Sequence, residues 1–127
     1  MRAHENPVQL KVLVVEDEQL VAMLVEDMLY DLGYEVTAIA SNLQAGLQIA
    51  EQIKFDLAVL DVNLNGEKSF PIADLLLEQG VPVVFASGYG LSGVKEFYPL
   101  VPVVQKPFTQ KALADALDAA RRWPSRL

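Results

Sequence analysis

Five polar side chains in this sequence are of the types that carry out phosphoryl chemistry, and each follows a short apolar stretch. Glu16 and Asp17 come first, and Asp61, Ser87 and Lys106 follow later stretches. Taken singly, each could be an ordinary loop residue. If the fold brings the carboxylates within about 4 Å, each pair repels by roughly 4 kcal/mol at an effective dielectric near 20, so the cluster needs a cation. Mg²⁺ is the natural candidate because it prefers a few oxygen ligands and bridges to phosphate oxygens.

Asp61 is the predicted nucleophile of this set. It stands alone at the end of its apolar stretch, whereas Glu16 and Asp17 are adjacent and better placed to share the metal ion. A carboxylate held against such an ion can attack phosphorus to give an acyl phosphate. Ser87 could donate a hydrogen bond to a phosphoryl oxygen, and Lys106 supplies a compact positive charge.

The apolar stretches before these side chains are predicted to be strands. Residues 11–15, 57–60 and 81–86 are continuous apolar runs rich in valine, which is typical of strands buried on both faces. Residues 34–40 predict one more strand, and Pro102 stands where a fifth should begin. Helices are predicted between them, starting near Ser41 or Asn42, Pro71 and Thr109. The inward-facing helix positions that the spacing predicts are Leu20, Leu24, Met28 and Leu32; Leu43, Leu47, Ala50 and Ile53; and Leu113, Ala116, Leu117 and Ala120.

The predicted order is a strand followed by a helix, five times over. Right-handed crossovers and short connections favour an α/β fold, a flavodoxin-like (βα)5 doubly wound parallel sheet with strand order 2-1-3-4-5. Three glycines and Pro99 lie between Ser87 and Lys106, which predicts a short or irregular fourth helix. Because the carboxyl ends of parallel strands meet at one edge of the sheet, we expect the five polar side chains to converge there.

The composition describes one acidic globular domain of 127 residues, with 52% hydrophobic residues, a formal net charge of −7 and no cysteine. The missing cysteine excludes disulfides and thiolate metal sites, and the negative charge argues against non-specific nucleic-acid binding. No apolar run approaches a membrane span and no secretory signal is evident, so we expect a cytoplasmic protein. We expect a flexible amino-terminal arm at 1–10, the domain at 11–122 and a carboxyl-terminal tail at 123–127.

Four strings of the sequence resemble the response-regulator receiver domains of two-component signalling, the CheY-like family. Each string alone would be weak evidence, and the specificity comes from the ordered set of polar positions. The resemblance covers nearly the whole chain, from about Lys11 to Arg121. The strings are VLVVEDE at 12–18, LAVLDVNL at 57–64, FASGYG at 85–90 and QKPF at 105–108.

The resemblance implies a phosphorelay signalling domain, not a turnover enzyme. Asp61 would accept a phosphoryl group from a histidine kinase or a phosphotransfer protein. Glu16, Asp17 and Asp61 would hold Mg²⁺, helped by the backbone carbonyl of Asn63.

The resemblance also assigns the residues that respond to phosphorylation, and here the sequence departs from the usual pattern. Ser87 and Lys106 would sense and hold the phosphoryl group, and the bond between Lys106 and Pro107 would be cis. Many receivers place a Tyr or Phe three residues before this lysine, where this chain has Val103. Tyr89 is the nearby alternative for an aromatic switch.

The string FASGYG resembles the motif of a receiver subgroup nicknamed FAT GUY, with Ser in place of the Thr of the nickname. In that subgroup the aromatic residue lies in the loop after the fourth strand. The resemblance implies an HWE-type sensor kinase of alphaproteobacterial stress signalling as the leading partner class. The glycines beside Tyr89 would permit a switch, but they could equally be plain turn residues.

No DNA-binding or catalytic region follows Arg122 in the sequence. We therefore expect a single-domain response regulator, a monomer or weak dimer, that signals through contacts with a downstream protein partner or acts as a phosphate sink. Neither nucleic acid nor a membrane is an expected partner. The alternative is a receiver domain excised from a larger regulator or hybrid kinase.

Three other functions compete with this interpretation. A hydrolase of the haloacid dehalogenase type needs a second acid two residues after its nucleophile, where this chain has Asn63. A flavodoxin would carry Thr, Ser and Gly after the first strand, whereas 16–18 are acidic and would repel a phosphate. A degenerate receiver that is never phosphorylated would not need all five polar residues.

Overall fold

A five-stranded parallel sheet forms the centre of the computed structural model, which describes residues 8–88 and 94–122. Its strands run in the order β2-β1-β3-β6-β7. The two-residue strands β4 and β5 lie outside this sheet, so β6 and β7 are its fourth and fifth strands, and the predicted order 2-1-3-4-5 is confirmed. The strands are β1 (Lys11–Val15), β2 (Glu35–Ala40), β3 (Leu57–Asp61), β6 (Val83–Ser87) and β7 (Val103–Gln105).

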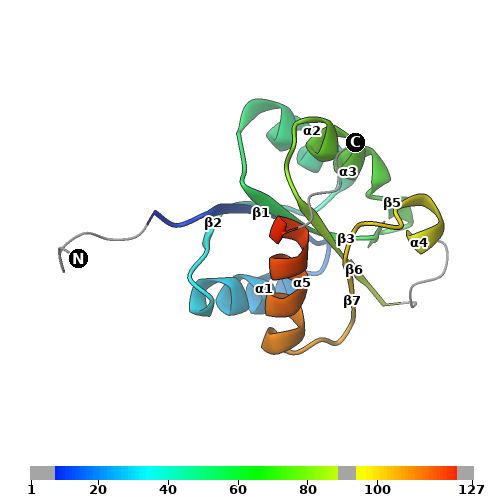
Figure 1. Cartoon of the computed structure of the whole chain (residues 1–127). Helices are drawn as coiled ribbons and strands as arrows, with labels where there is room; N and C mark the ends of the chain where they lie inside the picture. Colours follow the sequence, from blue (N-terminus) through cyan, green and yellow to red (C-terminus); the bar gives the residue numbers. More distant parts are fainter. Residues whose placement is uncertain (1–7, 89–93, 123–127) are drawn as a thin grey trace.

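Helices cover both faces of the sheet, as expected for a doubly wound fold (Figure 1). One face carries α1 and α5, and the other carries α2 and α3. The predicted short fourth helix is also confirmed, because α4 spans four described residues. The helices are α1 (Gln19–Asp31), α2 (Leu43–Gln52), α3 (Phe70–Glu78), α4 (Val94–Phe97) and α5 (Gln110–Arg122).

Strand β1 shows why the central strands are apolar at every position. Leu13 and Val15 belong to the core between the sheet and helices α2 and α3. Val12 and Val14 point to the opposite face and pack in the core beneath α1 and α5. Successive side chains of a strand point to opposite faces, so a strand with two covered faces buries all of them.

Helix α1 buries a different face from the one that the sequence predicted. Leu20 and Leu24, which we expected to face inward, are 76% and 59% exposed. The buried positions are Ala22, Val25 and Leu29, which are also spaced at the helical period. Because apolar residues surround much of this helix, spacing alone does not identify the buried face, and the fit of the helix against the sheet decides it.

Helix α2 packs closely against α3 at a glycine. A Cβ atom on Gly46 would lie 2.5 Å from Cδ1 of Ile72, a buried residue of α3. Gly46 and Ala50 are the buried residues of this helix, whereas Ile53, predicted to face inward, is 39% exposed. A small residue at the contact point lets the two helices approach.

A short hairpin follows β3, and the sequence analysis did not anticipate it. Its strands are β4 (Asn63–Leu64) and β5 (Glu67–Lys68). The connecting residues Asn65 and Gly66 have φ angles of 54° and 92°. An Asn-Gly pair with two positive φ angles is the preferred two-residue hairpin connection, so the local sequence explains this turn.

An aromatic cluster holds α4 against α3 and the end of β6. The ring centroid of Phe70 lies 5.8 Å from that of Phe85 and 5.1 Å from that of Tyr98. The Tyr98 hydroxyl donates a hydrogen bond to Oδ1 of Asp74 at 2.6 Å. Burial, the hydrogen bond to Asp74 and the charge of Asp74 all raise the pKa of Tyr98, so this donor stays protonated.

The arm and the tail that we expect on either side of the domain lie partly or wholly outside the described residues. Of the amino-terminal arm, only 8–10 are described, and the predicted tail at 123–127 lies outside. No helix in the described ranges is long and apolar enough to cross a membrane.

Two helix starts allow a matched test of capping. Oδ1 of Asn42 accepts a hydrogen bond from the Ala45 N–H at 2.8 Å, whereas Oγ of Ser69 is buried and, within the described residues, has no partner. We predict that Asn42→Ala lowers the free energy of unfolding by about 1 kcal/mol, because it removes a cap. Ser69→Ala should change it by less than about 0.5 kcal/mol or increase it, because it removes a buried hydroxyl that is not hydrogen-bonded. Urea titrations of both variants measure this, and equal losses would contradict the assignment.

Candidate functional site

The predicted polar residues meet at the carboxyl ends of the strands. Glu16 directly follows β1, Asp61 is the last residue of β3, and Ser87 is the last residue of β6. Lys106 directly follows β7. The parallel register sets these positions side by side, since Asp61 pairs with Ala86 and the next residue, Ser87, pairs with Gln105.

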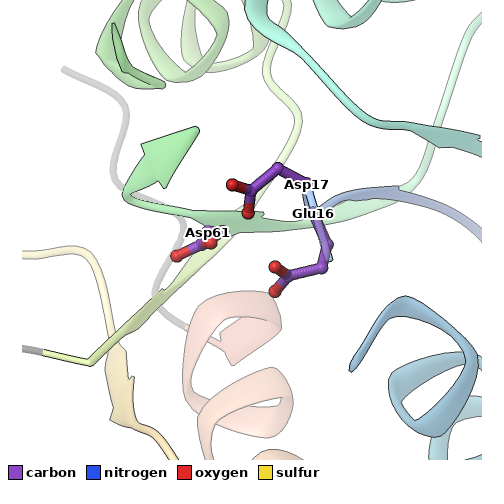
Figure 2. A group of neighbouring side chains, drawn as sticks. All are labelled: Glu16, Asp17 and Asp61. Atoms are coloured by element: carbon purple, nitrogen blue, oxygen red, sulfur yellow. The ribbon is translucent and has the colours of Figure 1, made fainter. Parts of the chain in front are cut away.

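Three carboxylates form an acidic cluster at this edge. Glu16, Asp17 and Asp61 each offer an oxygen atom, and these atoms all lie within 4.8 Å of one another. Figure 2 shows the three side chains gathered over the ends of β1 and β3. Glu16 and Asp61 are only 4% and 7% exposed, whereas Asp17 is half-buried. The cluster is thus a partly desolvated set of oxygen donors of the kind that hard cations prefer.

Lys106 supplies the positive charge inside the cluster. Its Nζ lies 2.8 Å from Oε1 of Glu16 and 3.3 Å from Oδ2 of Asp61. The backbone N–H of Lys106 donates to the carbonyl of Ser87 at 2.8 Å, and the bond from Lys106 to Pro107 is cis. The lysine therefore bridges the two most buried carboxylates.

Burial dominates the electrostatics of the site. It raises the pKa of Glu16 to about 7, although hydrogen bonds from Lys106 and from the Glu18 N–H oppose this. Burial also raises the pKa of Asp61, against the charge and hydrogen bond of Lys106. Burial lowers the pKa of Lys106, but its hydrogen bond to Glu16 and the charges of Asp61 and Glu16 outweigh that effect and raise it. One ammonium group thus compensates two buried carboxylates incompletely.

Backbone N–H groups hold the carboxylates of Glu16 and Asp17 in place, a feature that was not predicted from the sequence. The Glu18 N–H donates to Oε2 of Glu16 at 3.1 Å, and the Asn65 N–H donates to Oδ2 of Asp17 at 3.1 Å. The second bond ties the β4–β5 hairpin to the acidic cluster. The Asn-Gly signal at 65–66 could have indicated the hairpin, but not its contact with Asp17.

A cavity of about 650 Å³ opens above the cluster. Its lining includes Asp61, Asn63, Ser87 and Lys106, and also residues that the sequence did not mark as candidates, among them Lys68 and Phe70. Ser87 is buried, at 4% exposure.

Tyr89, the predicted switch residue, lies outside the described residues. Val103, which takes the place of an aromatic residue, is half-buried in β7 and pairs with Phe85 of β6. Aromatic rings lie near Val103, but they belong to the cluster formed by Phe70, Phe85 and Tyr98.

Comparison with known proteins agrees with this geometry. The response regulator receiver domain model matches residues 12–118. The chain is 40% identical to SdrG of Sphingomonas melonis Fr1, with a TM-score of 0.79 and coverage of 88% of this chain and 96% of that one. The receiver domain of the Erythrobacter litoralis PhyR response regulator superposes with a TM-score of 0.81, at 24% identity over 94% of this chain and 95% of that one, and shows the shared fold.

Among curated proteins, the chain is 32% identical to a protein-glutamate methylesterase/protein-glutamine glutaminase of Archaeoglobus fulgidus over 88% of this chain. The chain covers 33% of that relative. It is also 30% identical to a positive alginate biosynthesis regulatory protein of Pseudomonas aeruginosa over 93% of this chain, and it covers 49% of that protein. The chain thus spans between a third and about half of these relatives. The family model covers most of the chain. The chain belongs to the response regulator receiver domain family of two-component signalling.

Proposed function

We propose that this receiver domain accepts a phosphoryl group on Asp61. The observation that carries the proposal is the position of Asp61, which is 7% exposed at the end of β3, lines the cavity and lies 3.3 Å from the Lys106 ammonium. Asp17 also lines the cavity, but its Oδ2 accepts a hydrogen bond from the β4–β5 hairpin. Glu16 makes the shorter contact with Lys106, at 2.8 Å. Asp61 is therefore the best placed nucleophile.

In the proposed reaction an oxygen of Asp61 attacks the phosphorus atom of the donor. The bond from phosphorus to the donor's leaving atom breaks, and the leaving group keeps the bonding electrons. With acetyl phosphate the leaving group is acetate, which departs as an anion and needs no added proton. The product is an aspartyl phosphate.

The residues of the acidic cluster fit Mg²⁺. Glu16, Asp17 and Asp61 would hold it through their carboxylate oxygens, with the backbone carbonyl of Asn63 as a further ligand. Bound there, the ion would supply positive charge to the donor oxygens and to the crowded carboxylates. The chain itself fixes the carboxylates through the N–H groups of Glu18 and Asn65.

Ser87 and Lys106 complete the proposed site. Both line the cavity beside Asp61, and they are joined by the hydrogen bond from the Lys106 N–H to the Ser87 carbonyl. The Ser87 hydroxyl would donate to a phosphoryl oxygen, and the Lys106 ammonium would exchange part of its contact with the carboxylates for the new dianion. Tyr89 is the proposed switch residue.

The donor and target are proposed from chemistry and resemblance. A histidine kinase, of HWE type if the FASGYG string is a guide, or a phosphotransfer protein would deliver the phosphoryl group. The signal would then pass to a protein partner, or the domain would serve as a phosphate sink. High coverage of SdrG favours a stand-alone domain, whereas partial coverage of the curated relatives favours a receiver within a longer protein.

We predict that brief incubation with acetyl phosphate and Mg²⁺ adds one phosphoryl group, detected by intact mass spectrometry, and that Asp61→Asn abolishes the adduct. Asp115→Asn is the matched control, since Asp115 is exposed on α5 and forms only a surface ion pair with Lys111. It should be labelled like the wild type. Absence of an adduct in the wild type at every Mg²⁺ concentration, or an adduct that persists in Asp61→Asn, would refute the assignment.

We further predict that Asp61→Asn stabilises the metal-free protein at pH 8 by about 1 kcal/mol, because it removes one of two buried like charges. The raised pKa of Asp61 means that its ionised form lowers stability in the folded state. Urea unfolding in EDTA measures the gain.

Added Mg²⁺ should make the wild type more stable than Asp61→Asn, because the wild type gains free energy from binding the ion and the variant gains little. Asp115→Asn should match the wild type within about 0.5 kcal/mol in both conditions. A variant that Mg²⁺ stabilises as much as it does the wild type would show that Asp61 is not a ligand.

A further inference from the structure

The β4–β5 hairpin places a second lysine at the cavity. Lys68 lines the same cavity as Asp61 and Lys106. In the hairpin Lys68 is the direct partner of Asn63, another lining residue. Side chains of directly paired residues lie on the same face, so Lys68 and Asn63 face the cavity together.

Three hydrogen bonds fix the conformation of the hairpin, and one of them joins it to the acidic cluster. The Asn65 N–H donates to Asp17 at 3.1 Å, and the Gly66 N–H donates to Oδ1 of Asn63 at 2.8 Å. At the far end, the Ser69 N–H donates to the Val62 carbonyl at 2.9 Å. The backbone that carries Lys68 is therefore held directly against the acidic cluster.

The two lysines of the cavity differ in their charge partners. Lys106 is engaged with Glu16 and Asp61 and is 19% exposed. Within the described part of the chain, Lys68 makes no ion pair and is exposed. An exposed ammonium without a carboxylate partner, at the rim of a cavity lined by acids, is available to an anion that must enter that cavity.

We propose that Lys68 binds the anionic oxygens of the incoming phosphoryl donor and guides them toward Asp61. This inference rests on the proposed function of Asp61 and adds a donor-binding residue to it. The acidic chain repels a phosphate dianion, and the Lys106 ammonium is already paired with Glu16. Lys68 offsets that repulsion where the donor enters the cavity, because its ammonium is a compact positive charge of the kind that contacts phosphates.

The first test measures binding without transfer. Acetonylphosphonate, in which a methylene group replaces the bridging oxygen of acetyl phosphate, is titrated into the full chain with Mg²⁺ and followed by amide chemical shifts of 63–69. The wild type should bind it, and Lys68→Ala should raise the dissociation constant about three-fold, a size typical of one exposed charge contact. Lys68→Arg should stay near the wild type, and Lys68→Glu should bind more weakly than Lys68→Ala.

Lys54→Ala is the matched control. Lys54 is exposed and lies three residues before the start of β3, at the end of that strand opposite Asp61, so its loss changes the net charge equally without touching the cavity. It should bind the phosphonate like the wild type. An equal loss in Lys54→Ala, unchanged binding in Lys68→Ala, or no binding by the wild type would each overturn the inference.

The second test measures transfer from acetyl phosphate by intact mass at short times. Lys68→Ala should raise the half-saturating donor concentration about three-fold and leave the maximal rate within about two-fold, because the contact is made before the chemical step. A fall in the maximal rate alone would overturn the inference. If the wild type binds the phosphonate through Lys68 but is not phosphorylated, the inference stands and the proposed function of Asp61 fails.

Discussion

The shared contact of Lys106 with Glu16 and Asp61 is the interaction on which the rest of the site depends. It joins the ends of three strands, because Glu16 follows β1, Asp61 ends β3 and Lys106 follows β7. Two carboxylates and one ammonium leave a net negative charge in a partly desolvated place, which is costly unless further charge is supplied. The parallel sheet must hold its register to keep these groups together, since a shift of one residue would turn each side chain to the other face.

The acidic cluster therefore lowers the stability of the folded chain and favours the binding of positive charge. Burial raises the pKa of both Glu16 and Asp61, so the folded chain holds these carboxylates at a cost. A cation or a cationic side chain that reaches them recovers part of that cost, which is why the site is suited to bind one. The hairpin contributes to this balance, because its Asn65 N–H donates to Asp17 and because it carries a second lysine at the rim.

The surroundings of Ser87 differ from the receiver pattern in which an aromatic residue of the fifth strand follows phosphorylation. Here Val103 occupies that position, and the rings lie elsewhere: Phe85 precedes Ser87 by two residues and packs edge-on against Phe70 and Tyr98. A displacement at the end of β6 would thus meet the aromatic cluster that holds α4. The bond from Tyr98 to α3 makes this cluster a packed unit.

The sequence by itself determined the five strands of the sheet, their order and the residues that stand at their carboxyl ends. Valine-rich stretches predicted the strands, the alternation of strands and helices predicted the sheet order, and the residues at the strand ends predicted the site, because these depend on local periodicity and on one general rule for parallel sheets. Only the tertiary structure decided which face of α1 is buried, that the Asn65 N–H binds Asp17, and that Lys106 lies closer to Glu16 than to Asp61. These features depend on distances between residues far apart in the chain, and no spacing within the sequence encodes such a distance.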